Sequence, residues 1–191
     1  MKPHVITIAG ALGSGKSSTA NGVAHALGYR RFSAGDLQRA TATSLGLTYD
    51  KFQQLALADP AYDRKTDDTL IAAGKEDGVV IDSRLGYHFI PDSFKVFLTL
   101  TPEIAATRIL KDSKTNPNRQ RETAGGITNA ATIAAGIRER FAIERERYQI
   151  HYGITDYYDP KYFNIIIDTA KFPLDEVIQK VVTEYKKWSA S

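Results

Sequence analysis

The chain contains no cysteine and no long uninterrupted apolar run. Without thiols it can form no disulfide, no thiolate nucleophile and no Cys-ligated zinc site. Its first apolar run, residues 5–9, ends at Gly10 and is too short for a signal-peptide core or a membrane span. We therefore expect a cytoplasmic protein that has no membrane partner.

A strong charge of one sign is also missing. The 25 Lys and Arg residues are balanced by 22 Asp and Glu residues, which leaves a net charge of +3. Because these charges are scattered along the chain, we expect no nucleic-acid partner. They fit an ordinary solvated surface or a pocket for anionic substrates. The four histidines have neither metal-ligand spacing nor a paired serine, which argues against zinc and hydrolytic chemistry.

Short apolar runs rich in β-branched residues alternate with helical patterns. This alternation predicts an α/β fold with a parallel sheet of about five strands and helices on both faces. The length and the 42% hydrophobic content suit a single domain over residues 1–191. The expected strands are residues 5–9, 29–32, 78–82, 94–100 and 163–168. The expected helices are residues 16–27, 35–45, 48–58, 62–76, 102–113, 129–150 and 173–188.

One stretch, residues 112–128, differs from the rest of the chain. It is polar, carries Pro117 and a Gly125-Gly126 pair, and lacks apolar periodicity. This composition predicts a mobile loop or small lid. Arg119 and Arg121 within it are candidates for closing over a bound nucleotide and excluding water.

The segment from Gly10 to Ser17 (GALGSGKS) matches the phosphate-loop pattern G-x-x-x-x-G-K-[ST] between a short strand and a helix. Glycines let the backbone wrap round an anion, and the N–H groups and helix N-terminus supply positive potential. Lys16 can reach the β- and γ-phosphates. The pattern therefore predicts a three-layer P-loop NTPase fold. The expected ATP-binding residues are Gly10, Ala11, Leu12, Gly13, Ser14, Gly15, Lys16, Ser17 and Ser18.

Two oxygen-bearing side chains are expected to hold Mg²⁺ beside the phosphates. The Ser17 hydroxyl can ligate the ion, and Asp82, at the end of a strand, can hold it through water. The alternative for Asp82 is a solvated strand-end cap. Asp168 ends its strand in the same way, and there the capping role is favoured.

Arginines mark a possible second anion site. Arg39 lies in the first turns of an expected helix, and Arg84 lies two residues beyond Asp82 at the same sheet edge. Each alone is more often a surface charge. Beside a phosphate loop, however, two converging guanidinium groups suit an acceptor that already carries a phosphate.

A helix face near the C-terminal third is also charged. Arg140, Glu144 and Arg147 are spaced four and three residues apart, so they share one helix face. Cations that spread over the charge of the transferred phosphoryl group are what its transfer needs. Lys16, Arg140 and Arg147 are therefore the candidate catalytic residues. The alternative is a solvated helix held by ion pairs.

Three segments resemble those of nucleoside monophosphate kinases, above all the archaeal-type cytidylate kinases. They are Ser33 to Arg39 (SAGDLQR), Asp82 to Gly86 (DSRLG) and Glu144 to Ile154 (ERERYQIHYGI), and the likeness extends over nearly the whole chain. It implies ATP- and Mg²⁺-dependent phosphoryl transfer to a nucleoside monophosphate, with CMP or dCMP favoured. It also implies acceptor-binding helices within about residues 33–76.

The resemblance assigns individual roles as well. Arg108 would border the ATP base at the start of the lid. The acceptor-binding residues that it implies are Ser33, Asp36, Arg39, Arg84 and Glu144. Bacterial cytidylate kinases have an acidic residue where this chain has Leu85, so the choice of base is open. The segment with Asp63, Arg64 and Asp67 also resembles one near the acceptor pocket of these kinases. The alternative is that these residues stabilise the start of a helix.

Other functions remain as alternatives. A kinase of another small metabolite, and a nucleotide-binding regulatory protein without turnover, share the phosphate loop. The helix face with Arg140, Glu144 and Arg147 argues against a regulatory protein without turnover. No [NT]-K-x-D sequence occurs, which argues against a GTPase switch. We expect a monomer, with a homodimer as the alternative.

Overall fold

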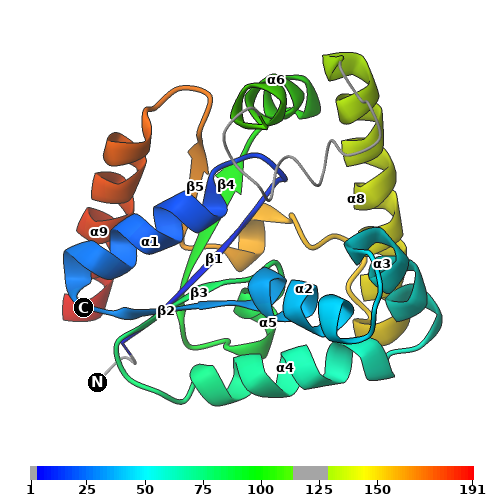
Figure 1. Cartoon of the computed structure of the whole chain (residues 1–191). Helices are drawn as coiled ribbons and strands as arrows, with labels where there is room; N and C mark the ends of the chain where they lie inside the picture. The colour runs from blue at the N-terminus through cyan, green and yellow to red at the C-terminus, as the bar shows by residue number, and fades with distance from the viewer. Residues whose placement is uncertain (1–3, 114–128) are drawn as a thin grey trace.

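The computed structural model describes residues 4–113 and 129–191. Its centre is a parallel five-stranded sheet in the order β2-β3-β1-β4-β5 (Figure 1). The strands are β1 Val5–Gly10, β2 Arg30–Ser33, β3 Val79–Asp82, β4 Phe94–Thr99 and β5 Ile165–Asp168. All five predicted strands are therefore present, and the predicted parallel arrangement is confirmed.

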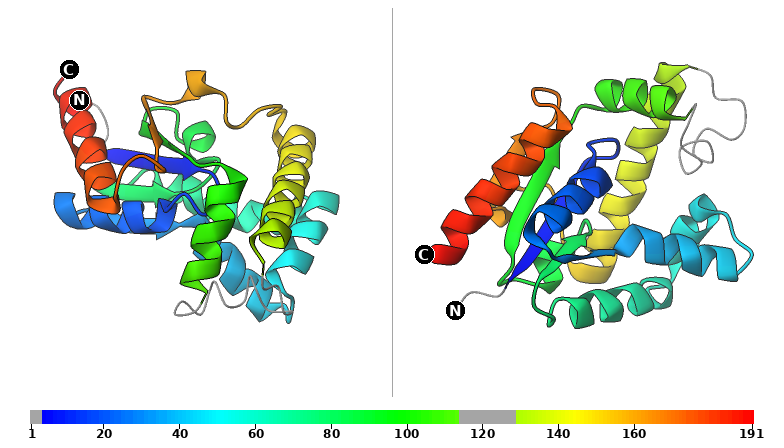
Figure 2. Two further views of the ribbon diagram at one scale, coloured as in Figure 1. Left: turned by 90° about the horizontal axis from the view of Figure 1, so that it is seen from above. Right: turned by 60° about the vertical axis from the view of Figure 1, so that its left-hand side comes forward.

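Helices cover both faces of this sheet, as predicted. They are α1 Lys16–Leu27, α2 Ala34–Ser44, α3 Tyr49–Ala58, α4 Ala61–Ala73, α5 Gly86–Phe89, α6 Pro102–Asp112, α8 Ala130–Tyr152 and α9 Leu174–Ala190. Figures 1 and 2 show α1 and α9 side by side against the sheet. Each predicted helix lies within three residues of its expected bounds. The short α5 and the 3-10 turn Pro160–Tyr162 were not predicted.

Two apolar clusters form the two interfaces of the three layers. On one face, Ile6 and Ile8 of β1 pack with Val23 of α1 and Val181 of α9. On the other face, Val5, Val79 and Ile81 pack with residues of α2 and α4, including Leu70. Because successive strand side chains point to opposite faces, one strand such as β1 serves both clusters.

The longest helix, α8, connects two parts of the molecule. It packs against α6 near the phosphate loop and against α3 in the segment expected to bind the acceptor (Figure 1). Most of the expected lid, residues 114–128 with Arg119 and Arg121, lies outside the described residues. No helix among the residues described is both long and apolar enough to span a bilayer.

Candidate active site

The phosphate loop has the conformation that its glycines predict. Gly13 and Gly15 adopt φ values of +76° and +83°, which favour glycine, and Gly15 directly precedes α1. A side chain at Gly10 would collide with the backbone oxygen of Leu98 on the neighbouring strand. The loop can therefore turn sharply between β1 and α1 and present its backbone N–H groups to an anion.

Lys16 lies at the first position of α1 and points back along the loop. Its Nζ donates a hydrogen bond to the carbonyl oxygen of Ala11 at 3.1 Å. Burial and the nearby guanidinium of Arg84 lower the pKa of Lys16 to about 7, although Asp82 and Glu144 act in the opposite direction. A bound phosphate would supply the negative charge that this cation lacks.

The structure brings together Ser17 and Asp82, the two residues expected to hold Mg²⁺. The Ser17 hydroxyl donates to Asp82 Oδ2 at 2.7 Å, and Asp82 is the last residue of β3. Both supply hard oxygen ligands, which suit Mg²⁺. Among the described residues no three His, Asp or Glu side chains gather into a metal cluster. A magnesium ion held here would therefore need phosphate oxygens to complete its coordination.

Arg31 also binds this carboxylate and was missed in the sequence. Its Nη2 lies 2.8 Å from Asp82 Oδ2, and its Nη1 lies 3.2 Å from Asp36 Oδ2. Arg31 thus connects the end of β3 to the start of α2. An arginine in a short, half-exposed strand gives no local signal of such a role.

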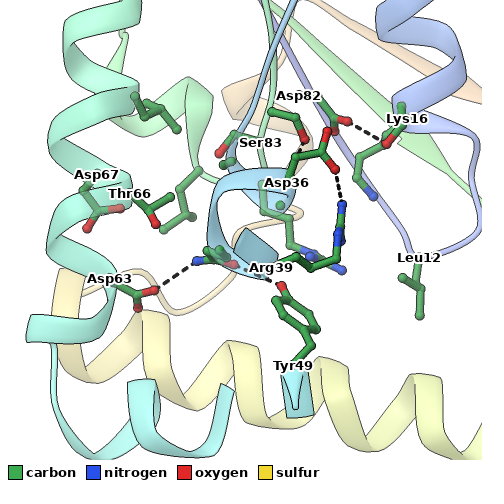
Figure 3. A pocket seen from close by; sticks show the side chains of 18 of the residues that line it. Leu12, Lys16, Asp36, Arg39, Tyr49, Asp63, Thr66, Asp67, Asp82 and Ser83 are labelled. Atoms are coloured by element: carbon green, nitrogen blue, oxygen red, sulfur yellow. Dashed lines mark hydrogen bonds and ion pairs between the residues drawn. The ribbon is translucent and has the colours of Figure 1, made fainter. Parts of the chain in front are cut away.

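A single cavity of about 390 Å³ extends from the phosphate loop to α4 (Figure 3). Most of the predicted site residues line it, and they come from α1, α2, β3 and α8 as well as the loop. The predicted residues in its wall are Leu12, Gly13, Gly15, Lys16, Ser17, Ser18, Ser33, Asp36, Arg39, Asp82, Arg84, Arg140 and Arg147. Gly10, Ala11, Ser14, Arg108 and Glu144 lie outside its described wall.

The start of α2 positions two arginines at the middle of this cavity. Ser33 caps the helix, because its Oγ accepts a hydrogen bond from the backbone N–H of Asp36 at 3.2 Å. Asp36 pairs with Arg39 at 2.6 Å and with Arg31. Burial acts to raise the pKa of Asp36, but the hydrogen bond and charge of Arg39 and the charge of Arg31 keep it below its ordinary value.

Glu144 lies outside the cavity wall and forms ion pairs with two arginines that belong to the wall. Its carboxylate, which is 3% exposed, lies 3.0 Å from Arg84 Nε and 3.1 Å from Arg140 Nε. Tyr157 OH also donates to it, at 3.3 Å. Burial alone would raise the pKa of Glu144, yet Arg84 and Arg140 keep it below its ordinary value. Glu144 is therefore an ionised anchor that fixes both guanidinium groups at the cavity wall.

Arg147 belongs to a closed ring of four buried or half-buried polar side chains. Its Nη1 donates to Gln53 Oε1 at 2.8 Å, and its Nε lies 3.4 Å from Asp63 Oδ2. Gln38 closes the ring, donating to Asp63 Oδ1 at 3.1 Å and accepting from Gln53 Nε2 at 3.4 Å. The ring joins α2, α3, α4 and α8. Arg147, expected to contact the transferred phosphoryl group, is 1% exposed and has its guanidinium bound to these partners.

Arg108 lies on α6, on the other side of the phosphate loop from α4. Its Nη2 donates to the carbonyl oxygen of Thr169 at 2.6 Å, and its Nη1 donates to the Thr169 hydroxyl at 3.2 Å. It thereby joins α6 to the turn that follows β5. Asp168 precedes this turn, and its Oδ1 accepts from the backbone N–H of Ala170 at 3.0 Å, which is the capping role expected for it.

Comparison with known proteins places this geometry in a family. Residues 6–129 match the family model described as an AAA domain. A cytidylate kinase from Archaeoglobus fulgidus is 33% identical over 186 residues, which are 95% of this chain and 96% of that protein. A cytidylate kinase from Pyrococcus furiosus is 33% identical over 174 residues, 91% of this chain and 83% of that protein.

A further relative is much longer than this chain. It is a protein from Lacinutrix mariniflava described as an S-adenosylmethionine-dependent nucleotide dehydratase, 31% identical over 187 residues. These residues are 97% of this chain but only 36% of that protein. Among solved structures, a shikimate kinase from Bacteroides thetaiotaomicron superposes with a TM-score of 0.63 over 98% of both chains, at 13% identity. This likeness supports the fold.

Proposed function

Because the chain belongs to the family described as an AAA domain and to the archaeal-type cytidylate kinases, we propose that it phosphorylates CMP or dCMP with MgATP. It is a P-loop small-molecule kinase. The products of the proposed reaction are ADP and a cytidine diphosphate.

The observation that carries the proposal is one cavity with two adjoining places for anions. The phosphate loop and Lys16 lie at one end, and Arg39, Arg84 and Arg140 lie in the same wall. Lys16 and Arg84 are close enough that Arg84 lowers the pKa of the lysine. Like charges held together in this way favour ligands with several negative charges, such as ATP beside a monophosphate.

The reaction needs positioning and charge stabilisation more than covalent help from the protein. The acceptor phosphate oxygen is already anionic, so its attack on the γ-phosphorus requires no general base. Lys16, Arg84 and Arg140 would spread over the negative charge of the transferred group. Bound Mg²⁺, held by Ser17 and through water by Asp82, would neutralise charge on the ATP phosphates. Glu144 and Asp36 keep the arginines in place.

The relatives support a nucleotide as acceptor. Two are described as cytidylate kinases, and the third is described as acting on a nucleotide. One alternative is that the same site transfers the phosphoryl group to another small metabolite. The other is that the protein is not an enzyme but a regulatory protein that binds nucleotides without turnover.

A coupled ADP-release assay tests the proposal. ATP and Mg²⁺ are supplied with CMP, dCMP, UMP, AMP, GMP or dTMP in turn, and fast turnover is expected with CMP or dCMP. Lys16→Ala should abolish transfer while leaving the circular dichroism spectrum unchanged. If no monophosphate accelerates ADP release above the ATP-only rate, the acceptor is not a nucleoside monophosphate.

A further inference from the structure

The cavity wall farthest from the phosphate loop comes from α4. Figure 3 shows Asp63, Thr66 and Asp67 on this helix, across the cavity from Leu12 and Lys16. Figure 3 shows Arg39 between these two ends, and Arg84 and Arg140 line the same cavity. A monophosphate whose phosphate met these arginines would therefore direct its base toward α4.

The α4 end has apolar walls that suit a flat base. Leu70, Leu85, Phe89 and Tyr152 line the cavity here. Apolar and aromatic walls with a few polar groups are the usual lining of a site for a flat ligand. Selection between bases must then come from those few polar groups.

Two α4 carboxylates line the cavity, Asp63 and Asp67, and they differ in how their oxygens are held. Asp63 is held on both sides within the ring, because its Oδ1 accepts a hydrogen bond from Gln38 and its Oδ2 forms a buried ion pair with Arg147. Asp67 Oδ2 accepts a hydrogen bond from Tyr152 OH at 2.6 Å, and no hydrogen bond between the described residues uses its Oδ1. The bond from Tyr152 fixes the carboxyl group, so that Oδ1 has a defined place in the cavity wall.

We propose that Asp67 reads the acceptor base and selects one with an exocyclic amino group, as in cytosine, over one with a carbonyl at the same position, as in uracil. The inference rests on the proposed function. In a pyrimidine nucleotide, position 4 lies across the ring from the bond to the ribose, so it is the part of the base farthest from the phosphate. Cytosine carries an amino donor there and uracil carries a carbonyl acceptor.

An ionised carboxylate can only accept hydrogen bonds. It can therefore accept one from the amino group of cytosine, whereas the carbonyl oxygen of uracil would face it as a second acceptor without a hydrogen bond. Burial raises the pKa of Asp67 to about 6, and Asp63 adds to the effect while the bond from Tyr152 opposes it. At pH 8 the carboxyl group is therefore ionised and acts as an acceptor.

The test compares CMP with UMP in the wild-type protein and in Asp67→Asn at pH 8. Asparagine keeps the shape of the side chain, and its carbonyl can still accept from Tyr152, which turns an N–H donor toward the base. The ratio of kcat/KM for CMP to that for UMP should fall by about 10- to 100-fold, the usual range for losing a buried polar match. Asp68→Asn is the matched control, because Asp68 is the exposed next residue of α4 with the same charge.

The outcomes separate this inference from the proposed function. If the wild-type protein phosphorylates no monophosphate, the proposed function fails. If it phosphorylates CMP but Asp67→Asn leaves the CMP-to-UMP ratio unchanged, or if wild type prefers UMP, only the role of Asp67 fails. Should Asp67→Asn not fold, Tyr152→Phe frees the carboxyl group from its anchor, and an unchanged ratio in that variant overturns the inference equally.

Discussion

At the scale of single residues, the site consists of charged groups that hold one another in place before any ligand arrives. Asp36 fixes Arg31 and Arg39, and Glu144 fixes Arg84 and Arg140. Preorganised guanidinium groups need no rearrangement when negative charge develops, which is the main electrostatic advantage of an enzyme site. Lys16 is the exception, because its pKa is lowered to about 7.

The lowered pKa of Lys16 predicts proton uptake when MgATP binds at pH 8. Free Lys16 is then mostly neutral, and the bound phosphates raise its pKa above 8, so each binding event takes up most of one proton. At pH 6 the lysine is protonated before and after binding, and the uptake disappears. Calorimetric titrations in buffers of different ionisation enthalpy measure it.

Lys16→Met is the control for this measurement, since it removes the titrating group. Equal proton uptake in wild type and Lys16→Met would show that another group accounts for it. No uptake at pH 8 in the wild-type protein would mean that Lys16 is already charged in the free state.

Local sequence predicted the residues of the loop but not their distant partners. Gly10, Gly15 and Lys16 could be found because the phosphate-loop pattern is contiguous and each position has its own physical requirement. Arg31 and Gln53 could not, since their partners Asp82 and Arg147 are 51 and 94 residues away in the sequence. Their roles depend on how strands and helices pack.

At the scale of elements, α8 packs both against α3, in the segment proposed to bind the acceptor, and against α6 near the phosphate loop. The spacing of Arg140, Glu144 and Arg147 predicted that all three share one helix face. Glu144 and Arg147 are buried there and Arg140 is half-buried, so the alternative of a solvated face is wrong for Glu144 and Arg147. The sequence could not show which partner each would have. Arg147 meets Asp63 and Gln53, so it connects helices.

Arg147→Met should strongly destabilise the fold. It leaves Asp63 as a buried carboxylate without its ion pair, and breaking a buried pair on one side costs about 3–5 kcal/mol. Urea unfolding at 25 °C measures the change. Arg145→Met is the matched control on the same helix, because Arg145 is exposed and its loss should cost less than about 1 kcal/mol. Equal effects of the two substitutions would contradict the role of the ring.

At the scale of the whole molecule, the parallel sheet brings separate segments to one edge. The ends of β1 and β3 supply the phosphate loop and Asp82, and Ser33 at the end of β2 starts the segment proposed to bind the acceptor. Ligands of open α/β sheets bind at such carboxyl edges. The alternation of strands and helices predicted this architecture, because its signals repeat along the whole chain.

One continuous cavity predicts that a single molecule can fill both subsites. Adenosine and cytidine joined through a chain of five phosphates should raise the melting temperature more than ATP and CMP together at the same concentrations. The linked ligand binds its second half intramolecularly, at a high effective concentration. Differential scanning fluorimetry measures the shift. A smaller shift for the linked ligand than for the two separate nucleotides would argue that the subsites are not in line.

The most direct test of the account is to follow the γ-phosphoryl group itself. ATP labelled in that group is incubated with Mg²⁺, CMP and the wild-type protein, and the nucleotides are separated. The account predicts that the label appears in CDP, at a rate that depends on CMP and is lost in Lys16→Ala. Label that stays in ATP, or that appears only in inorganic phosphate, would contradict it.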